Sequence, residues 1–258
     1  MDASVEPQME LTIPRTLITG TVLAVISVVV FFMSGFGYNW DIWSLGTAFQ
    51  MFKWGAVGAL AGLLLTVIGS AVANFSSSFQ IASMSWIGII LSIIVVGTAV
   101  YFIIRARTVP SIHDITTDTA EPPEFIALRD LRERAPNEVE YAGEEVAKQQ
   151  LANYPDIKPM FLDMSEAEAF DKALESARAM NWEIHAVDTA EHRIEATHQI
   201  MWFGFKDDVV IRVRHDSTRS RVRIDMRSAS RIGKSDVGEN ARRIKRYMKV
   251  LRSKVKQE

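Results

Sequence analysis

Charged side chains are almost missing from the first part of the chain. Only Asp41 and Lys53 carry a charge between residues 16 and 104, whereas charges are frequent from residue 105 to the end. Hydrocarbon excludes charged groups, and a segment rich in them has to face water. The chain therefore changes solvent once. This predicts an N-terminal tail over 1–15, a membrane region over 16–104 and a soluble domain over 105–258.

Three apolar runs lie within the predicted membrane region. Each has about 20 residues, the length that a helix needs to cross the hydrocarbon core of a bilayer. They extend over Thr16–Gly35, Phe52–Ala73 and Met84–Ile104. No ionisable residue lies in their interior, and transporters usually need one there. We therefore interpret the region as an anchor of three transmembrane helices, with the lipid bilayer as its partner.

The charges next to the apolar runs indicate on which side of the membrane the soluble domain lies. Three spans place the two ends of the chain on opposite sides of the membrane, with Arg15 on one side and Lys53, Arg105 and Arg107 on the other. The positive-inside rule then favours a cytoplasmic soluble domain. The difference is small, so the sequence leaves the side undecided.

Two glycines in the second run, Gly58 and Gly62, stand four residues apart. Small residues at this spacing let two helix backbones approach closely. Two interpretations are open. The glycines pack helices within a monomeric three-helix bundle, or they mediate self-association of two chains.

The absence of cysteine and an uneven charge distribution narrow the classes of function. Without cysteine the chain has no disulfide, no thiolate nucleophile and no thiolate metal site.

Residues 110–195 hold 20 acidic and 8 basic side chains, whereas residues 219–256 hold 3 acidic and 14 basic ones. This asymmetry indicates an acidic half folded against a basic half, or a basic surface for an anion.

Hydrophobic periodicity in the soluble domain changes from that of a helix to that of strands and back. Ser165 and Glu168 form a capping box that starts a helix. Four stretches between residues 182 and 226 then alternate with period two, which is typical of antiparallel strands with one wet face. The last helix carries an apolar stripe from Val237 to Val255. We predict an α+β domain with a four-stranded antiparallel meander flanked by helices.

Prolines concentrate in the segment that precedes this pattern. Residues 105–164 contain six of the eight prolines of the chain. Proline removes a backbone donor and restricts φ, so this segment cannot form one long helix. We expect an extended segment with short helices that wraps the domain.

Cations gather on the last two predicted strands and in the turn that follows them. Arginines alternate on the face expected to be wet, and the turn leads into the last helix. Arginine matches oxyanions, and the free N–H groups of a helix N-terminus attract them. The candidate anion-binding residues are Arg227, Ser228, Ser230, Arg231, Lys234 and Ser235. The alternative is a solvated, salt-bridged face that ends in a tight structural turn.

No cofactor is expected. The Gly-Lys-Ser triplet of residues 233–235 is part of a nucleotide-binding loop pattern, but Ser228 stands where that loop requires an earlier glycine. A second cluster, His113, Asp114 and Asp118, could offer metal ligands. No second histidine has helical metal spacing, so no metal is expected. Nucleic acid is not expected either, because the aromatic residues fall in the membrane region or on apolar strand faces.

Three stretches of the soluble domain carry a resemblance to a known family. They read P-S-I-H-D-I-T-T-D-T-A-E-P-P-E-F from Pro110, Y-P-D-I-K-P from Tyr154 and R-S-A-S-R-I-G-K-S-D-V-G-E-N-A-R-R-I from Arg227. They resemble the family catalogued as domain of unknown function 1499, over essentially the whole soluble domain. The resemblance implies a membrane-associated bacterial or plastid protein, here placed in a bacterial cytoplasmic membrane. Relatives that look like lipoproteins imply an extracytoplasmic domain, against the charge count, and the resemblance implies no catalytic residue.

Three functions remain open from the sequence. The expected one is a non-enzymatic module at the membrane, which binds an anionic ligand, a lipid headgroup or a partner protein through Arg231, Lys234 and the N-terminus of the last helix. A second is a hydrolase or transferase in which the fold brings together His113, Asp114 and Ser228 or Ser230. A third is a structural subunit of a membrane complex.

Overall fold

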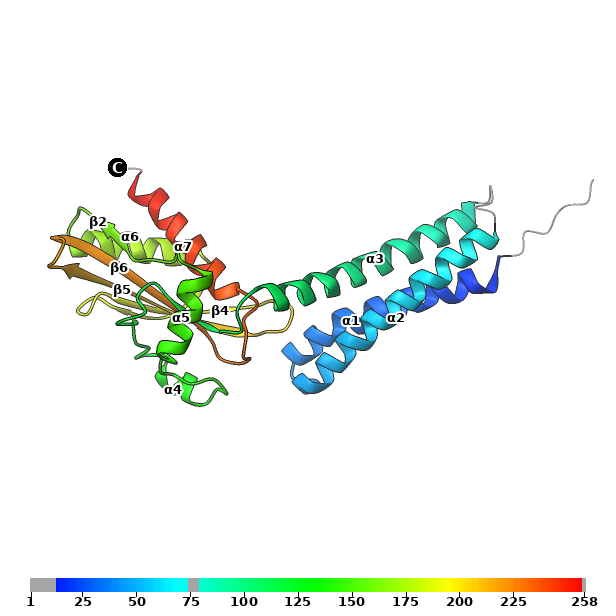
Figure 1. The fold of residues 1–258 in the computed structure, drawn as a ribbon, viewed down its shortest axis with the longest axis horizontal. Helices are drawn as coiled ribbons and strands as arrows, with labels where there is room; N and C mark the ends of the chain where they lie inside the picture. Colours follow the sequence, from blue (N-terminus) through cyan, green and yellow to red (C-terminus); the bar gives the residue numbers. More distant parts are fainter. Residues whose placement is uncertain (1–12, 74–78, 257–258) are drawn as a thin grey trace, which may run out of the picture. The chain divides into compact units, whose positions relative to one another are not determined.

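A computed structural model of the chain describes residues 13–73 and 79–256. The chain forms two compact units, Met1–Phe102 and Ile103–Glu258. The first consists of long helices and the second combines a sheet with shorter helices (Figure 1).

Three long apolar helices make up the first unit, and the last six residues of the third belong to the second unit. They are α1 (Arg15–Asn39), α2 (Leu45–Val72) and α3 (Phe79–Thr108). Each is long and apolar enough to cross a membrane, which confirms the three predicted helices and indicates contact with a lipid bilayer. Each helix begins before the apolar run that predicted it, and α1 and α3 also continue past the end of their runs.

Glycines bring α1 and α2 close together. A Cβ atom on Gly58 would lie 2.5 Å from Ser27 Oγ, and one on Gly62 would lie 3.0 Å from the backbone nitrogen of Ala24. Both glycines therefore face α1 of the same chain. The structure therefore favours the first interpretation, in which Gly58 and Gly62 pack α2 against α1 within one chain.

Hydroxyl groups link α3 to the other two helices. Ser70 on α2 donates a hydrogen bond to Ser85 Oγ on α3 (2.7 Å), and Thr21 on α1 donates to the carbonyl of Met84 (3.2 Å). Hydroxyls that find partners across a helix interface avoid the cost of an unsatisfied polar group in hydrocarbon. Large apolar side chains such as Ile26, Leu64 and Ile93 are more than half exposed and form the outer surface of the unit.

The second unit contains the predicted antiparallel meander. Its strands are β3 (Glu183–Asp188), β4 (Arg193–Gln199), β5 (Lys206–Asp216) and β6 (Arg221–Ser230). Two further strands, β1 (Asp114–Thr116) and β2 (Met160–Leu162), pair with β6 at different positions along its free edge. The sheet order is β1-β6-β5-β4-β3, which confirms the α+β prediction and extends it by two short strands.

Helices α6 (Glu166–Ala179) and α7 (Glu239–Val255) cover the apolar face of this sheet (Figure 1). The predicted capping box is formed, since Ser165 Oγ accepts from the Glu168 N–H and the Glu168 carboxylate accepts from the Ser165 N–H. Tyr247 of α7 is fully buried, stacks on Trp182 and donates a hydrogen bond to the carbonyl of Ala173 (3.1 Å). The apolar core of the unit lies between these helices and the sheet.

The other face of the sheet is not wet, which corrects the prediction from alternation. The segment 117–141, which includes α4 (Arg129–Glu133), lies over it through Phe125, Leu128 and Val139. The adjoining α5 (Glu144–Asn153) is tied to β1 because the Gln150 amide bonds both the N–H and the carbonyl of Thr116 (3.0 and 2.6 Å). The proline-rich segment therefore wraps the domain, and the polar strand residues beneath it are buried or half-buried.

Candidate functional site

The covered face of the sheet holds a layer of buried ion pairs. At one end, Asp208 of β5 is fully buried and accepts hydrogen bonds from Arg132 Nη1 (3.0 Å) and from Arg231 Nε and Nη2 (2.9 and 2.8 Å). Arg132 comes from α4 and is 1 % exposed. Arg231, a predicted anion-binding residue, therefore already holds an internal carboxylate with both arms of its guanidinium.

Arg227 of β6 occupies the next position in this layer. It forms a forked pair with Asp114 of β1, from Nε to Oδ1 (3.0 Å) and from Nη2 to Oδ2 (2.7 Å). Its Nη2 also donates to the Val139 carbonyl (2.8 Å), and its guanidinium lies 4.9 Å from the centre of the Phe125 ring. Arg227 is 2 % exposed, so its charge serves the attachment of β1 and the covering segment.

At the far end three arginines surround two aspartates. Arg212 and Arg223 bond the fully buried Asp225 of β6 (3.1 and 2.8 Å). Arg214 bonds Asp118 of the covering segment (3.3 Å), whose carboxylate Arg223 also contacts. The Arg214 hydrogen bond also lowers the pKa of Glu121, which keeps that carboxylate charged. The arginine face expected to bind external anions is thus neutralised largely from within the chain.

Glu195 of β4 completes the layer by holding backbone groups. Its carboxylate accepts the N–H groups of Ile126, Ala127 and Leu128 at 2.8 to 3.0 Å, directly before α4 begins. It is 1 % exposed. A buried carboxylate with three N–H donors is well compensated, so Glu195 fastens the covering segment to the sheet.

Ser228 and Ser230 point to the opposite face, toward α7. Asn240 bonds Ser228 Oγ through its carbonyl (2.6 Å) and Ser230 Oγ through its amide (3.0 Å). Arg243 Nη1 donates to Ser228 Oγ (3.0 Å), and its Nη2 pairs with Asp207 of β5 (2.6 Å). This network is buried and joins the N-terminal part of α7 to the ends of β5 and β6.

In the turn between β6 and α7, Lys234 is the one candidate anion-binding residue that is exposed. The Asp236 carboxylate accepts the N–H groups of Gly238 and Asn240 (both 2.7 Å), which occupies donors that an external anion would use, and burial raises its pKa. Ser235 Oγ accepts from the Val237 N–H (3.2 Å). Lys234 is exposed.

The second candidate cluster is not brought together as a catalytic group. His113 contributes its backbone carbonyl, which accepts from the Ser230 N–H and the Asn240 amide (both 2.9 Å). Asp114 points to Arg227, on the face of the sheet opposite to Ser228 and Ser230. Asp118 bonds arginines on β5 and β6, away from Asp114. A nucleophile and its acid–base partners have to lie within hydrogen-bond reach, and these side chains do not.

The protein family described as "Protein of unknown function (DUF1499)" matches residues 114–251. The chain belongs to this family. The DUF1499 region begins at the first residue of β1 and ends at Leu251, a buried residue of α7. It therefore contains the whole ion-pair layer and the serine network. None of the curated proteins compared with the chain is similar to it.

The DUF1499 domain also has a cationic surface that the sequence interpretation overlooked. On its exposed side α7 carries Arg246, Lys249 and Arg252, and Lys256 follows as the C-cap residue. These four lie on one side of the helix because their spacing of 3, 3 and 4 residues follows the helical period. The same periodicity that identified the buried stripe could have identified this face.

His198 of β4 makes a pH-dependent contribution to stability. Burial and the nearby Arg243 charge lower its pKa, although Asp207 opposes this. Below about pH 6.5 the unfolded histidine binds a proton that the folded one resists. The free energy of unfolding should therefore fall as the pH drops from 7 to 5, and His198→Gln should reduce this fall.

Urea unfolding of the full-length protein in detergent at both pH values, followed by near-UV circular dichroism, measures this difference. His215→Gln is the control, because His215 is exposed at the end of β5. If the two variants show the same pH dependence, His198 is not responsible for it.

Proposed function

We propose that this chain is a non-enzymatic, membrane-anchored accessory module, and that the outer face of α7 binds an acidic surface of a partner protein. The observation that carries the proposal is the row of exposed cations Arg246, Lys249, Arg252 and Lys256. None of them has an ion-pair partner among the described residues. The neighbouring Lys245 and Lys254 pair with Asp156 and Glu175, so this row is what remains unneutralised along α7.

The excess of positive charge on α7 supports a role of these cations in binding a partner rather than in stabilising the fold. The only acidic residue of the helix is Glu239, at its first position, where it pairs with Arg242. In the ion-pair layer, by contrast, the arginines are matched by carboxylates. A row of like charges destabilises an isolated helix, and complementary charge on a partner removes this repulsion.

The length of the row favours a protein surface over a single small anion. The four cations follow one another along α7 and its C-cap. An acidic protein surface can match such a row along its whole length.

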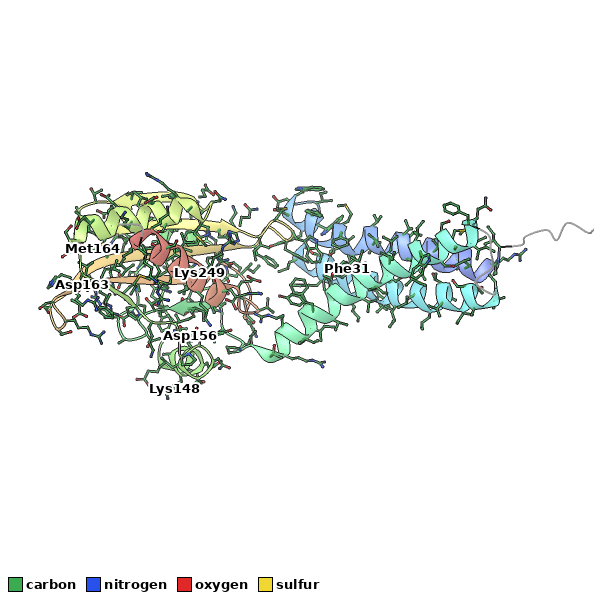
Figure 2. All side chains as sticks on the ribbon, turned by 90° about the horizontal axis from the view of Figure 1, so that it is seen from above. Phe31, Lys148, Asp156, Asp163, Met164 and Lys249 are labelled. Atoms are coloured by element: carbon green, nitrogen blue, oxygen red, sulfur yellow. The ribbon has the colours of Figure 1, made fainter. Side chains whose placement is uncertain are left out.

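Photo-cross-linking of the full-length protein in cells tests this contact. A photoreactive residue at position 249 on α7 should give a discrete protein adduct, and one at position 148 on α5 should not (Figure 2). The double reversal Arg246→Glu, Arg252→Glu should reduce the adduct about tenfold, since two favourable surface pairs become repulsive. The control Lys148→Glu, Lys158→Glu changes the same charge on exposed residues elsewhere.

Two results would contradict the proposal. One is an adduct yield at position 249 no greater than at position 148. The other comes from full-length protein in phosphatidylcholine nanodiscs. If it binds added phosphatidylglycerol vesicles and the α7 reversal abolishes this, the face recognises lipid and not a protein.

A further inference from the structure

Helix α6 lies beside α7 on the same face of the sheet and carries the opposite charge. The Tyr247 hydroxyl of α7 donates a hydrogen bond to the Ala173 carbonyl of α6 (3.1 Å), so the two helices are direct neighbours (Figure 1). Helix α6 holds four acidic and two basic residues, whereas α7 holds one acidic and seven basic residues. Two neighbouring helices of opposite charge thus form one layer of the domain.

The acidic residues of α6 gather on its outer side. Glu168, Asp171 and Glu175 are exposed, and their spacing of 3 and 4 residues places them in one row along the helix. The buried residues Ala169 and Ala173 lie on the other side, against the apolar core. This acidic row is about 10 Å long, because a helix rises about 1.5 Å per residue. The cations of α7 from residue 246 to residue 252 extend over about 9 Å, so the two rows match in length.

The acidic row is only partly neutralised within the chain. Asp171 has no ion-pair partner among the described residues. Glu168 accepts hydrogen bonds in the capping box but pairs with no cation there. Glu175 contacts Lys254, and the charge of Lys172 lies near Glu168 and Glu175. Hydrogen bonding lowers the pKa of Glu168 and of Glu175, which keeps both carboxylates charged at neutral pH.

The two rows make the outer surface of this helix pair complementary to itself. A two-fold axis that runs between α6 and α7 would place the acidic row of each copy opposite the cation row of the other. A single exposed ion pair is weak, but this symmetry makes every attraction occur twice. A second copy also carries the same three apolar helices, so one bilayer would confine both copies and raise their effective concentration.

We propose that the acidic surface bound by α7 is the acidic row of α6 in a second copy of this chain. Two copies then associate through a two-fold axis between α6 and α7. This inference rests on the proposed function, because it names the partner of the α7 face. Salt should weaken the association, since it screens attraction between exposed charges.

Charge reversal of the two rows, separately and together, tests this dimer in the full-length protein. Two differently tagged copies are produced in the same cells and purified in detergent through one tag. The α7 reversal Arg246→Glu, Arg252→Glu and the α6 reversal Asp171→Lys, Glu175→Lys should each reduce the co-purified copy at least about tenfold, because like charges then face each other. The four changes combined in one chain restore opposite charges and should restore the association.

The matched control for these variants is Lys148→Glu, Lys158→Glu, which reverses two exposed charges outside both rows and should leave the association unchanged. Association that none of the reversals alters would show that the copies meet elsewhere and would overturn the inference. The inference also fails if the combined variant keeps the circular dichroism of the unmodified chain but does not associate.

Cross-linking of the unmodified surface identifies the partner without relying on the reversed variants. A photoreactive residue at position 249 should give an adduct with the mass of two chains, and mass spectrometry should find a peptide of α6 in it. A discrete adduct with a different protein would overturn this inference and leave the proposed function standing. An adduct no stronger than that from position 148 would contradict both.

Discussion

Asp208→Asn should destabilise the second unit by about 3–5 kcal/mol, the cost of removing one partner from a buried ion pair. Asp208 is fully buried and is the only carboxylate within ion-pair distance of Arg132 among the described residues. Arg132 would keep its hydrogen bonds to the carbonyls of Ala229 and Glu138 but would lose its compensating charge. Arg231 would lose the same partner. The covering segment should then detach from the sheet.

Urea-dependent hydrogen exchange of β5 and β6 in the full-length protein measures this effect on the second unit. Asp163→Asn is the matched control, because it removes the same charge from the Arg221 pair, whose side chains are 40 % and 75 % exposed. Exposed pairs contribute less than about 1 kcal/mol. If both variants unfold at the same urea concentration, the buried charge layer does not hold the segment in place.

Gly69→Leu should separate α1 from α2 and cost about 3 kcal/mol or more, as overpacking against a backbone does. A Cβ atom at Gly69 would lie 2.6 Å from the Cα atom of Leu17. No rotamer change relieves this clash, because the backbone of α2 fixes the position of the Cβ atom and the Leu17 Cα belongs to the backbone of α1. The detergent-solubilised protein should lose its monodisperse peak in size-exclusion chromatography at a clearly lower temperature than the unmodified chain.

Gly97→Leu provides the control for this prediction. Gly97 is exposed on α3, and a Cβ atom there meets nothing within 4 Å. Both changes replace glycine by a good helix former, so the gain in helix propensity of about 1 kcal/mol is shared. Equal thermal behaviour of the two variants would show that the close approach of α1 and α2 does not limit stability.

Alternation along the chain predicted the strands of the meander but not what covers them. Period two shows that Arg212 and Arg223 lie on the face opposite to Val213 and Ile224, and water was the simplest partner for that face. The strands β1 and β2 have three residues each, too few for a periodic signal. They were found only through their pairing with β6, which is remote in sequence.

In the candidate site too, the sequence indicated which residues matter, and only the fold showed what each of them does. The sequence marked Arg227, Arg231 and Asp114 as chemically notable, and all three are central to the structure. Their roles follow from contacts across 113 residues between Arg227 and Asp114 and across 23 residues between Arg231 and Asp208. A residue type indicates that a charge is present, and only the fold determines whether that charge is neutralised or free.

By itself the sequence predicted three helices that are long and apolar enough to cross a membrane, because the cost of placing charge in hydrocarbon depends on composition alone. It also determined the meander and its two flanking helices, because local periodicity shows which side chains share a face. Only the tertiary structure decided that the segment 117–141 covers the arginine face and pairs its charges, and that a row of cations on α7 stays unpaired. Ion pairing depends on distances between segments remote in sequence, and no local pattern contains those distances.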